Sequence, residues 1–127
     1  MNADSQSIND LSEAIIGRAL VVSNVLGVGF LEKVHENALA HELRKTGLAV
    51  RQQHGVEVRY DGIVVGSYTT DLLVENAVLV ELKATRTLDL HPCHPVPQLP
   101  EGDGLLLCLL LNFGNPRLQI RRFANGL

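Results

Sequence analysis

The stretch that decides the fold is GSYTTDLLVENAVLVELKA, residues 66–84. Two runs rich in β-branched and apolar residues flank a short turn at Asn76, and this pattern predicts two paired strands. We expect the first strand within residues 63–74 and the second over residues 77–82. The second run is apolar at nearly every position, which is typical of a strand covered on both faces.

Two carboxylates and one amine lie on these strands. Pairing across the turn should bring Asp71 and Glu81 close together. Residues i and i+2 of a strand share a face, so Glu81 and Lys83 should point the same way while Leu82 points into the core. Burying such groups is costly unless they are paired or bind a metal. A structural salt bridge at a strand end is the alternative interpretation.

These three residue types suit phosphodiester hydrolysis. Asp71 and Glu81 would hold one or two Mg²⁺ or Mn²⁺ ions, because hard cations prefer oxygen ligands and keep several waters. Such a metal lowers the pKa of a bound water and neutralises charge that builds on the phosphate. Lys83 would orient that water or stabilise the charge.

Helices are predicted ahead of the hairpin. Apolar residues recur at three- and four-residue steps from Asp10, which predicts a helix that ends near Gly27. A second helix should begin near Phe30 and end before Gly47. Residues 1–9 show no such pattern, and we expect a disordered tail there.

Further strands are predicted on both sides of the central pair. Asp61-Gly62 is a strong hairpin-turn signal after an alternating run over residues 56–60. Gly66 marks a candidate bulge in the strand that follows. Residues 105–113 predict a buried strand, and the alternation around Ile120 predicts an edge strand.

Composition limits the function classes. The 127 residues fit a single domain over residues 10–127, and 46% hydrophobic content is enough for a core. A net charge of −3 and 4% aromatic content argue against a dedicated nucleic-acid binder, which is usually basic. Carboxylates that hold metal ions can still contact DNA, because the metals supply the positive charge.

Localisation follows from three further features. Two cysteines are too few for a disulfide framework, which favours a reducing cytoplasm. The polar N-terminus lacks a signal-peptide pattern. The longest apolar run, residues 105–111, is too short to cross a bilayer, so we expect a cytoplasmic domain without membrane contact.

Three sequence blocks, in this order, resemble a known family: residues 15–48, IIGRALVVSNVLGVGFLEKVHENALAHELRKTGL; residues 66–84, quoted above; and residues 109–123, LLLNFGNPRLQIRRF. The chain resembles the small bacterial GxxExxY proteins of the PD-(D/E)XK nuclease superfamily over nearly all of residues 11–123. The resemblance implies a restriction-endonuclease-like α+β core, with N-terminal helices packed on a mixed central sheet. It also implies a hydrolase that acts on nucleic acid, DNA first, with Asp71, Glu81 and Lys83 as catalytic residues.

The motif that names the family falls on Gly29, Glu32 and position 35, where His35 replaces the tyrosine. On a helix Glu32, His35 and Glu36 share one side. By resemblance to related nucleases, Glu32 is a candidate third metal ligand, and a solvated helix face is the alternative. His35 could act as a hydrogen-bond donor or a ligand, or mark a weakened site.

Arg117, Arg121 and Arg122 lie near the final strand and are candidate phosphate contacts. Charges at a strand edge also protect against edge-to-edge pairing, which is the alternative role for them.

The segment over residues 89–104, DLHPCHPVPQLPEGDG, departs from the family. Its prolines exclude a stable helix. The family places a helix of the type AQLLNYLKATG there, so we expect this core helix to be disrupted over residues 90–104. Codons for residues 95–104 can be chosen so that a one-base shift reads QCLNYLKATG, which suggests a compensated pair of frameshifts. His91, Cys93 and His94 then form a loop rather than a zinc site, since their spacing matches no common zinc arrangement.

The sequence therefore supports a metal-dependent nuclease that the disrupted helix has impaired. A non-catalytic module that binds nucleic acid or protein on the same fold is the second hypothesis, and a degraded, inactive copy is the third. Loss of the helix would expose apolar surface, so self-association into a homo-oligomer is expected.

Overall fold

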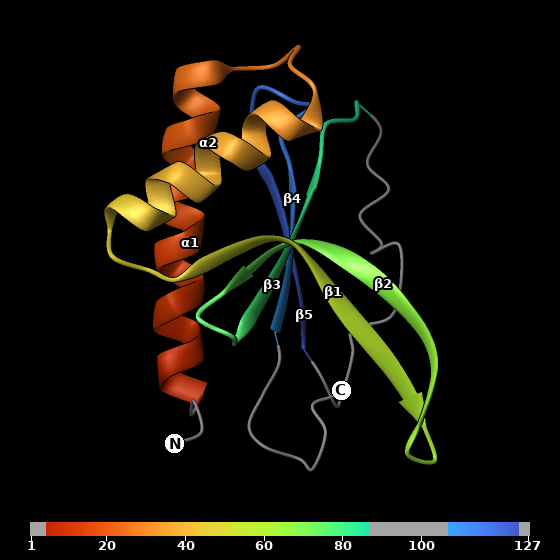
Figure 1. Cartoon of the computed structure of the whole chain (residues 1–127). Helices are drawn as coiled ribbons and strands as arrows, with labels where there is room; N and C mark the ends of the chain where they lie inside the picture. The colour runs from red at the N-terminus through yellow and green to blue at the C-terminus, as the bar shows by residue number, and fades with distance from the viewer. Residues whose placement is uncertain (1–4, 87–106, 125–127) are drawn as a thin grey trace.

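A computed structural model describes residues 5–86 and 107–124, which form two helices and one sheet of five strands (Figure 1). The elements run in the order α1 (Ser5–Leu26), α2 (Glu32–Lys45), β1 (Val50–Tyr60), β2 (Ile63–Val74), β3 (Val78–Lys83), β4 (Leu107–Asn112) and β5 (Gln119–Ala124). The expected α+β architecture, with N-terminal helices on a mixed sheet, is confirmed. No helix in the described ranges is long and apolar enough to cross a membrane.

The strands lie side by side in chain order, β1-β2-β3-β4-β5. All neighbours are antiparallel except β3 and β4, which run parallel from Val78 opposite Leu107 to Lys83 opposite Asn112. A parallel pair needs a crossover connection, which here spans residues 84–106. The structure describes only residues 84–86 of this connection. The predicted disruption of the helix at 90–104, with the frameshift hypothesis for it, and the cluster of His91, Cys93 and His94 concern residues outside the described part of the chain.

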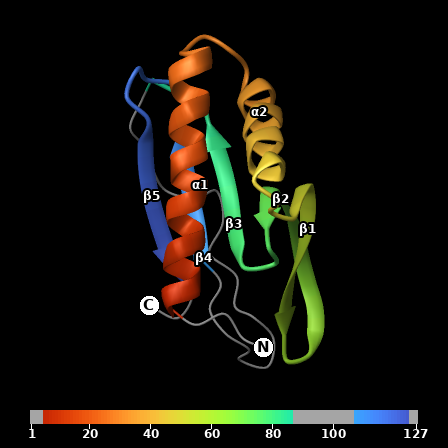
Figure 2. The ribbon, with the colours of Figure 1, turned by 90° about the vertical axis from the view of Figure 1, so that its left-hand side faces the viewer.

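Both helices pack on one face of the sheet (Figure 2). Their apolar stripes meet the strand residues that point toward them, and the buried set includes Ile15, Ala19, Leu39, Leu43, Val80, Leu82, Leu109 and Leu111. The opposite face carries a smaller cluster of Leu73, Leu79 and Cys108. Adjacent positions of β3 thus serve different faces, as strand geometry requires.

Two helix boundaries differ from the prediction. Helix α1 begins at Ser5 rather than Asp10, so residues 5–9 are helical instead of belonging to a tail. Ile8 is only 3% exposed, because it extends the stripe of Ile15 by two turns into the core. Helix α2 begins at Glu32 rather than near Phe30, because Leu31 is still extended (φ −67°, ψ 155°).

The β1–β2 hairpin is the longest paired element. Its turn uses Asp61 and Gly62 with positive φ values of 56° and 77°, as the Asp-Gly pair predicts. The register shifts between Val58, which pairs with Gly66, and Arg59, which pairs with Val64. The bulge expected near Gly66 is confirmed.

Candidate active site

Asp71 and Glu81 lie at the point where β2 and β3 stop pairing. The register sets Leu72 opposite Val80, so one further step places Asp71 opposite Glu81. Asp71 Oδ2 accepts a hydrogen bond from the backbone N–H of Leu82 at 2.8 Å, in place of a strand-to-strand backbone bond. The predicted proximity of these two carboxylates is therefore supported by both register and hydrogen bonding.

Glu81 occupies an environment that disfavours its charge. It is 7% exposed and alternates with Val80 and Leu82, which face the helices, so it points to the other side of the sheet. Burial, and then the negative charge of Asp71, raise its pKa from 4.5 to about 7, although the nearby Lys83 acts in the opposite direction. Lys83 follows two residues later on the same face, as predicted.

Glu81 also affects two neighbours outside the predicted set. Burial, and then the charge of Glu81, raises the pKa of Tyr68 to about 12. The same two causes raise the pKa of the Cys108 thiol to about 12. Cys108 is therefore a buried, protonated thiol beside the carboxylates rather than a reactive nucleophile.

Helix α2 contributes a third carboxylate, but from Glu36. This residue is 3% exposed and accepts hydrogen bonds from Gln53 Nε2 at 2.8 Å, Gln52 Nε2 at 2.8 Å and Lys33 Nζ at 3.1 Å. Gln53 Nε2 also donates to Asp71 Oδ1 at 3.2 Å. One amide thus connects the helix carboxylate to the strand carboxylate.

The backbone of Gln53 explains how its side chain reaches both groups. Its φ is +52°, a left-handed conformation that non-glycine residues adopt only at a cost. The residues on either side, Gln52 and His54, keep their register with Leu72 and Thr70. The distortion is therefore local to the position across from Asp71.

Glu32, the predicted helix ligand, is exposed at the first residue of α2. It lies one turn before Glu36, and no contact between it and Asp71 or Glu81 is found in the described residues. The missed residue had a sequence signal, since Glu36 precedes the buried Leu39, Ala40 and Leu43 at helical spacing.

His35 is part of the packing between the helices and the sheet. Its ring is fully buried and stacks on Phe113 with centroids 4.6 Å apart, and Phe30 meets its edge at 6.1 Å. Nε2 lies 3.1 Å from the Gly27 carbonyl, which can only accept, so Nε2 carries a proton. Gly29 lies in the connection with φ +100°, a conformation that favours glycine. Of the predicted alternatives for His35, the structure supports the hydrogen-bond donor.

The three arginines have different surroundings. Arg121 pairs with Leu110, which pairs in turn with Glu81, so Arg121 lies on the same sheet face as Glu81, two strands away. Arg122 lies on the helix side, where its Nη2 donates to Asn9 Oδ1 of α1 at 2.8 Å. Arg117 is exposed in the turn before β5.

The residues present fit a hard divalent cation. Asp71 and Glu81 offer carboxylate oxygens, and one or two carboxylates plus waters are a usual Mg²⁺ ligand set. The pKa of Glu81 is raised first by burial and then by the charge of Asp71, and a cation between the two carboxylates would offset both effects. Within residues 5–86 and 107–124 no group of three or more His, Cys, Asp or Glu side chains is arranged to hold a metal. Glu36 is therefore connected to the candidate metal site indirectly, through the hydrogen bonds of Gln53 to Glu36 and to Asp71.

Comparisons with known proteins agree with this geometry. A family model described as PD-(D/E)XK nuclease superfamily matches residues 9–123. Searches of curated proteins and of solved structures found no match. Nucleases of the matched superfamily generally use divalent metals and act on nucleic acid.

Proposed function

Because the chain belongs to the PD-(D/E)XK nuclease superfamily, we propose that it hydrolyses phosphodiester bonds in nucleic acid with a divalent metal ion bound at Asp71 and Glu81. The observation that carries this proposal is the position of Asp71 across from Glu81, whose pKa is raised to about 7. Two carboxylates held close together at a partly buried site repel each other, and a divalent cation bound between them would offset that repulsion. Mg²⁺ is the expected ion, with Mn²⁺ as an alternative.

When bound, the metal supplies a water of lowered pKa and a positive charge next to the scissile phosphate. The protein groups supply position and charge around it. Asp71 is held by the Leu82 N–H and by Gln53, so its side chain is fixed before any ligand arrives. Lys83, on the Glu81 face, places a cation where negative charge develops during phosphate hydrolysis.

Glu36, rather than Glu32, is the carboxylate of α2 that is connected to the strand carboxylates. Its hydrogen bond through Gln53 to Asp71 orients the strand carboxylate, and such outer contacts tune metal affinity. Glu36 is bonded to three side chains, so it is an orienting group here rather than a direct ligand.

DNA is the proposed substrate, and Arg121 is the arginine best placed for a phosphate. It lies on the sheet face of Glu81, whereas Arg122 is bonded to α1. Because the chain carries a net charge of −3, the bound metal must supply much of the attraction for the phosphates. Membership of the GxxExxY group within the superfamily stays a prediction.

Metal titration followed by cleavage assays tests the proposal. Mn²⁺ binding, measured by calorimetry, should weaken at least about tenfold in Asp71→Asn, while the exposed Glu13→Gln serves as the matched control and binds as wild type. Lys83→Met should keep metal binding and lose cleavage of DNA. Wild-type protein that binds no divalent metal would overturn the metal site.

The same assays distinguish the non-catalytic alternative. A wild-type protein that binds Mn²⁺ yet cuts neither DNA nor RNA, single- or double-stranded, would contradict the nuclease proposal. Retained DNA binding in that case would favour a binding module on the nuclease fold.

A further inference from the structure

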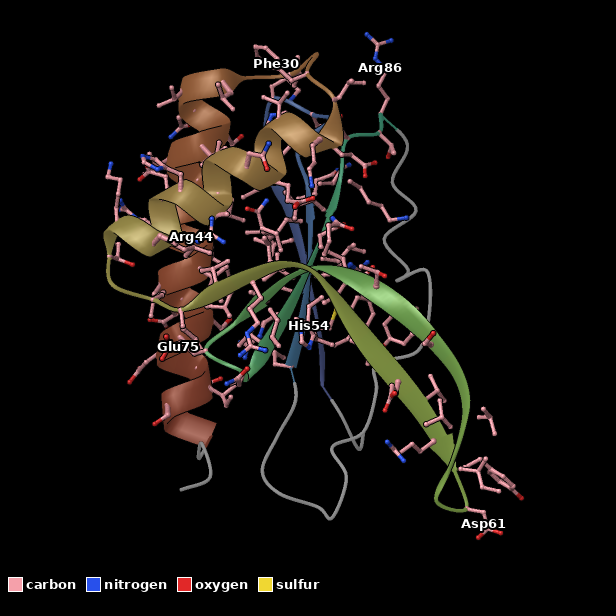
Figure 3. The ribbon with its side chains drawn as sticks, viewed as in Figure 1. Phe30, Arg44, His54, Asp61, Glu75 and Arg86 are labelled. Atoms are coloured by element: carbon pink, nitrogen blue, oxygen red, sulfur yellow. The ribbon has the colours of Figure 1, made fainter. Side chains whose placement is uncertain are left out.

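The β1–β2 hairpin extends beyond the layer that the helices cover. Figure 1 shows it projecting from the rest of the sheet, and Figure 3 places Asp61 at its tip. Strand β1 is first in the sheet order, and among the described helices and strands it contacts only β2 and α2. Its outer edge past Gln53 therefore has no described strand beside it.

This arm exposes more apolar surface than a solvated hairpin needs. Large hydrophobic side chains near its tip are exposed, in the fractions Val58 41%, Tyr60 74%, Ile63 65%, Val64 43% and Val65 59%. An unpaired strand edge flanked by exposed apolar residues is a template for another strand. The opposite edge of the sheet, β5, instead carries two exposed arginines, Arg121 on one face and Arg122 on the other, and this positive charge would repel a second copy.

The sequence of β1 is complementary to itself in one antiparallel register. A two-fold axis at Val58 sets this residue opposite its own copy. Val56 then lies opposite Tyr60 of the second copy, so a small apolar side chain meets a large one. Glu57 lies opposite Arg59 of the second copy, and the same two contacts occur twice because the pairing is reciprocal.

Charge complementarity makes this register specific. Glu57 and Arg59 already form an ion pair within one chain at 2.8 Å, with about half of each side chain exposed. Across the two-fold axis each acid faces a base of the other chain, and no like charges meet between positions 56 and 60. Moving the two-fold axis by one residue would set Arg59 opposite its own copy or Glu57 opposite its own copy.

We propose that the outer edge of β1 pairs with β1 of a second copy of this chain, antiparallel about Val58, to form a symmetric dimer with one continuous sheet. The closed two-fold contact brings the exposed Val58 and Tyr60 of β1 against apolar side chains of the second copy. It also pairs the outer edge of β1 in both copies, so that no further copy can add a strand there.

The first test measures the mass of the full chain by sedimentation over a concentration series. We expect a monomer–dimer equilibrium. Val58→Lys sets the two introduced lysines of the dimer opposite each other at the two-fold axis. Their repulsion should weaken the dimer at least about tenfold. Val25→Lys makes the same change at an exposed apolar residue of α1 (75% exposed) and should leave the equilibrium unchanged.

The second test mixes two charge variants. Glu57→Arg alone sets arginine against Arg59 twice, and Arg59→Glu alone sets glutamate against Glu57 twice, so each variant should be more monomeric than wild type. Mixed in equal amounts, the two should form a heterodimer, because every cross-chain pair then joins opposite charges. The intrachain ion pair is broken in both variants, so its loss cannot explain recovery on mixing.

The proposal would be overturned by a wild-type monomer at every concentration, by a dimer that Val58→Lys leaves intact, or by the absence of a heterodimer on mixing. Assembly beyond the dimer would also contradict it, because this contact closes on itself. None of these readouts depends on metal binding or cleavage, so the dimer and the nuclease activity fail or stand separately.

Discussion

The side-chain amide of Asn112 pairs with the backbone of Thr85 as a neighbouring strand would. Its Nδ2 donates to the Thr85 carbonyl at 2.9 Å, and its Oδ1 accepts from the Thr85 N–H at 3.0 Å. Two residues before Thr85, the Lys83 carbonyl accepts a hydrogen bond from the Phe113 N–H at 2.8 Å. These bonds continue the β3–β4 pairing past the last strand residue, so the chain on both sides of Lys83 is held from β4.

Gly114 is expected to be intolerant of a side chain, because a Cβ there would collide with the Thr85 backbone. Gly114→Ala must displace the segment that follows Lys83 and should lower the free energy of unfolding by about 3 kcal/mol, at the upper end for overpacked sites. Urea denaturation measures this. Gly17→Ala is the control: its Cβ meets nothing within 4 Å in α1, so it should stabilise by about 0.5–1 kcal/mol. Equal effects at the two glycines would contradict the packing seen at Thr85.

Gln53 should separate backbone strain from side-chain bonding. Gln53→Ala keeps the left-handed backbone and loses the bonds to Glu36 and Asp71, so we expect a loss of about 1 kcal/mol in unfolding free energy. Gln53→Gly loses the same bonds but removes the cost of φ +52°, and should recover about 1 kcal/mol relative to alanine. Denaturation of both variants beside wild type gives the comparison. If alanine were the more stable of the two, the left-handed conformation at this position would be wrong.

The raised pKa of Glu81 predicts how stability depends on pH without metal. The folded-state pKa is about 7 and the ordinary value is 4.5, so the folded chain binds this proton more tightly than the unfolded chain does. The stability that the protonated carboxyl contributes is fully present below about 4.5 and is lost as the pH rises through about 7. In EDTA, Glu81→Gln should therefore gain stability over wild type at pH 8 and gain little at pH 4.5. The exposed Glu13→Gln should show no such dependence.

His35 should matter for stability because of its stacking on Phe113. His35→Ala removes a fully buried ring and should lower the unfolding free energy by about 3 kcal/mol. His41→Ala changes an exposed histidine of the same helix and should stay within about 0.5 kcal/mol of wild type. His35→Phe keeps a ring against Phe113 and should recover most of the loss. A phenylalanine variant as unstable as the alanine variant would instead point to the Gly27 hydrogen bond.

The strands were the most predictable part of the fold. The Asp-Gly turn fixes the pairing of β1 with β2, and the apolar runs on either side of Asn76 fix the pairing of β2 with β3. The second pairing places Asp71 across from Glu81. Period-two alternation also placed Glu81 and Lys83 on one face. Local pattern sufficed here because the two strands are joined by a short turn.

The rest of the site depends on contacts between distant segments. The spacing of Glu36 to the buried residues of α2 favours its burial over that of Glu32. Only its hydrogen bonds with Gln52 and Gln53 of β1 show that this carboxylate reaches the strands. The left-handed backbone of Gln53 has no sequence signal, because glutamine gives no preference for it. The bond between Arg122 and Asn9 joins the two ends of the chain, which no local pattern reports.

The parallel pairing of β3 with β4 has a consequence for synthesis of the chain. A nascent polypeptide that has emerged only through Lys83 already contains the carboxylates and their orienting amide, yet its β3 is then an open edge until β4 arrives. Closing that long connection is slow relative to forming the hairpins before it. During the interval between the two events the open edge of β3 is exposed, and slow translation there would lengthen the time in which the growing chain can aggregate.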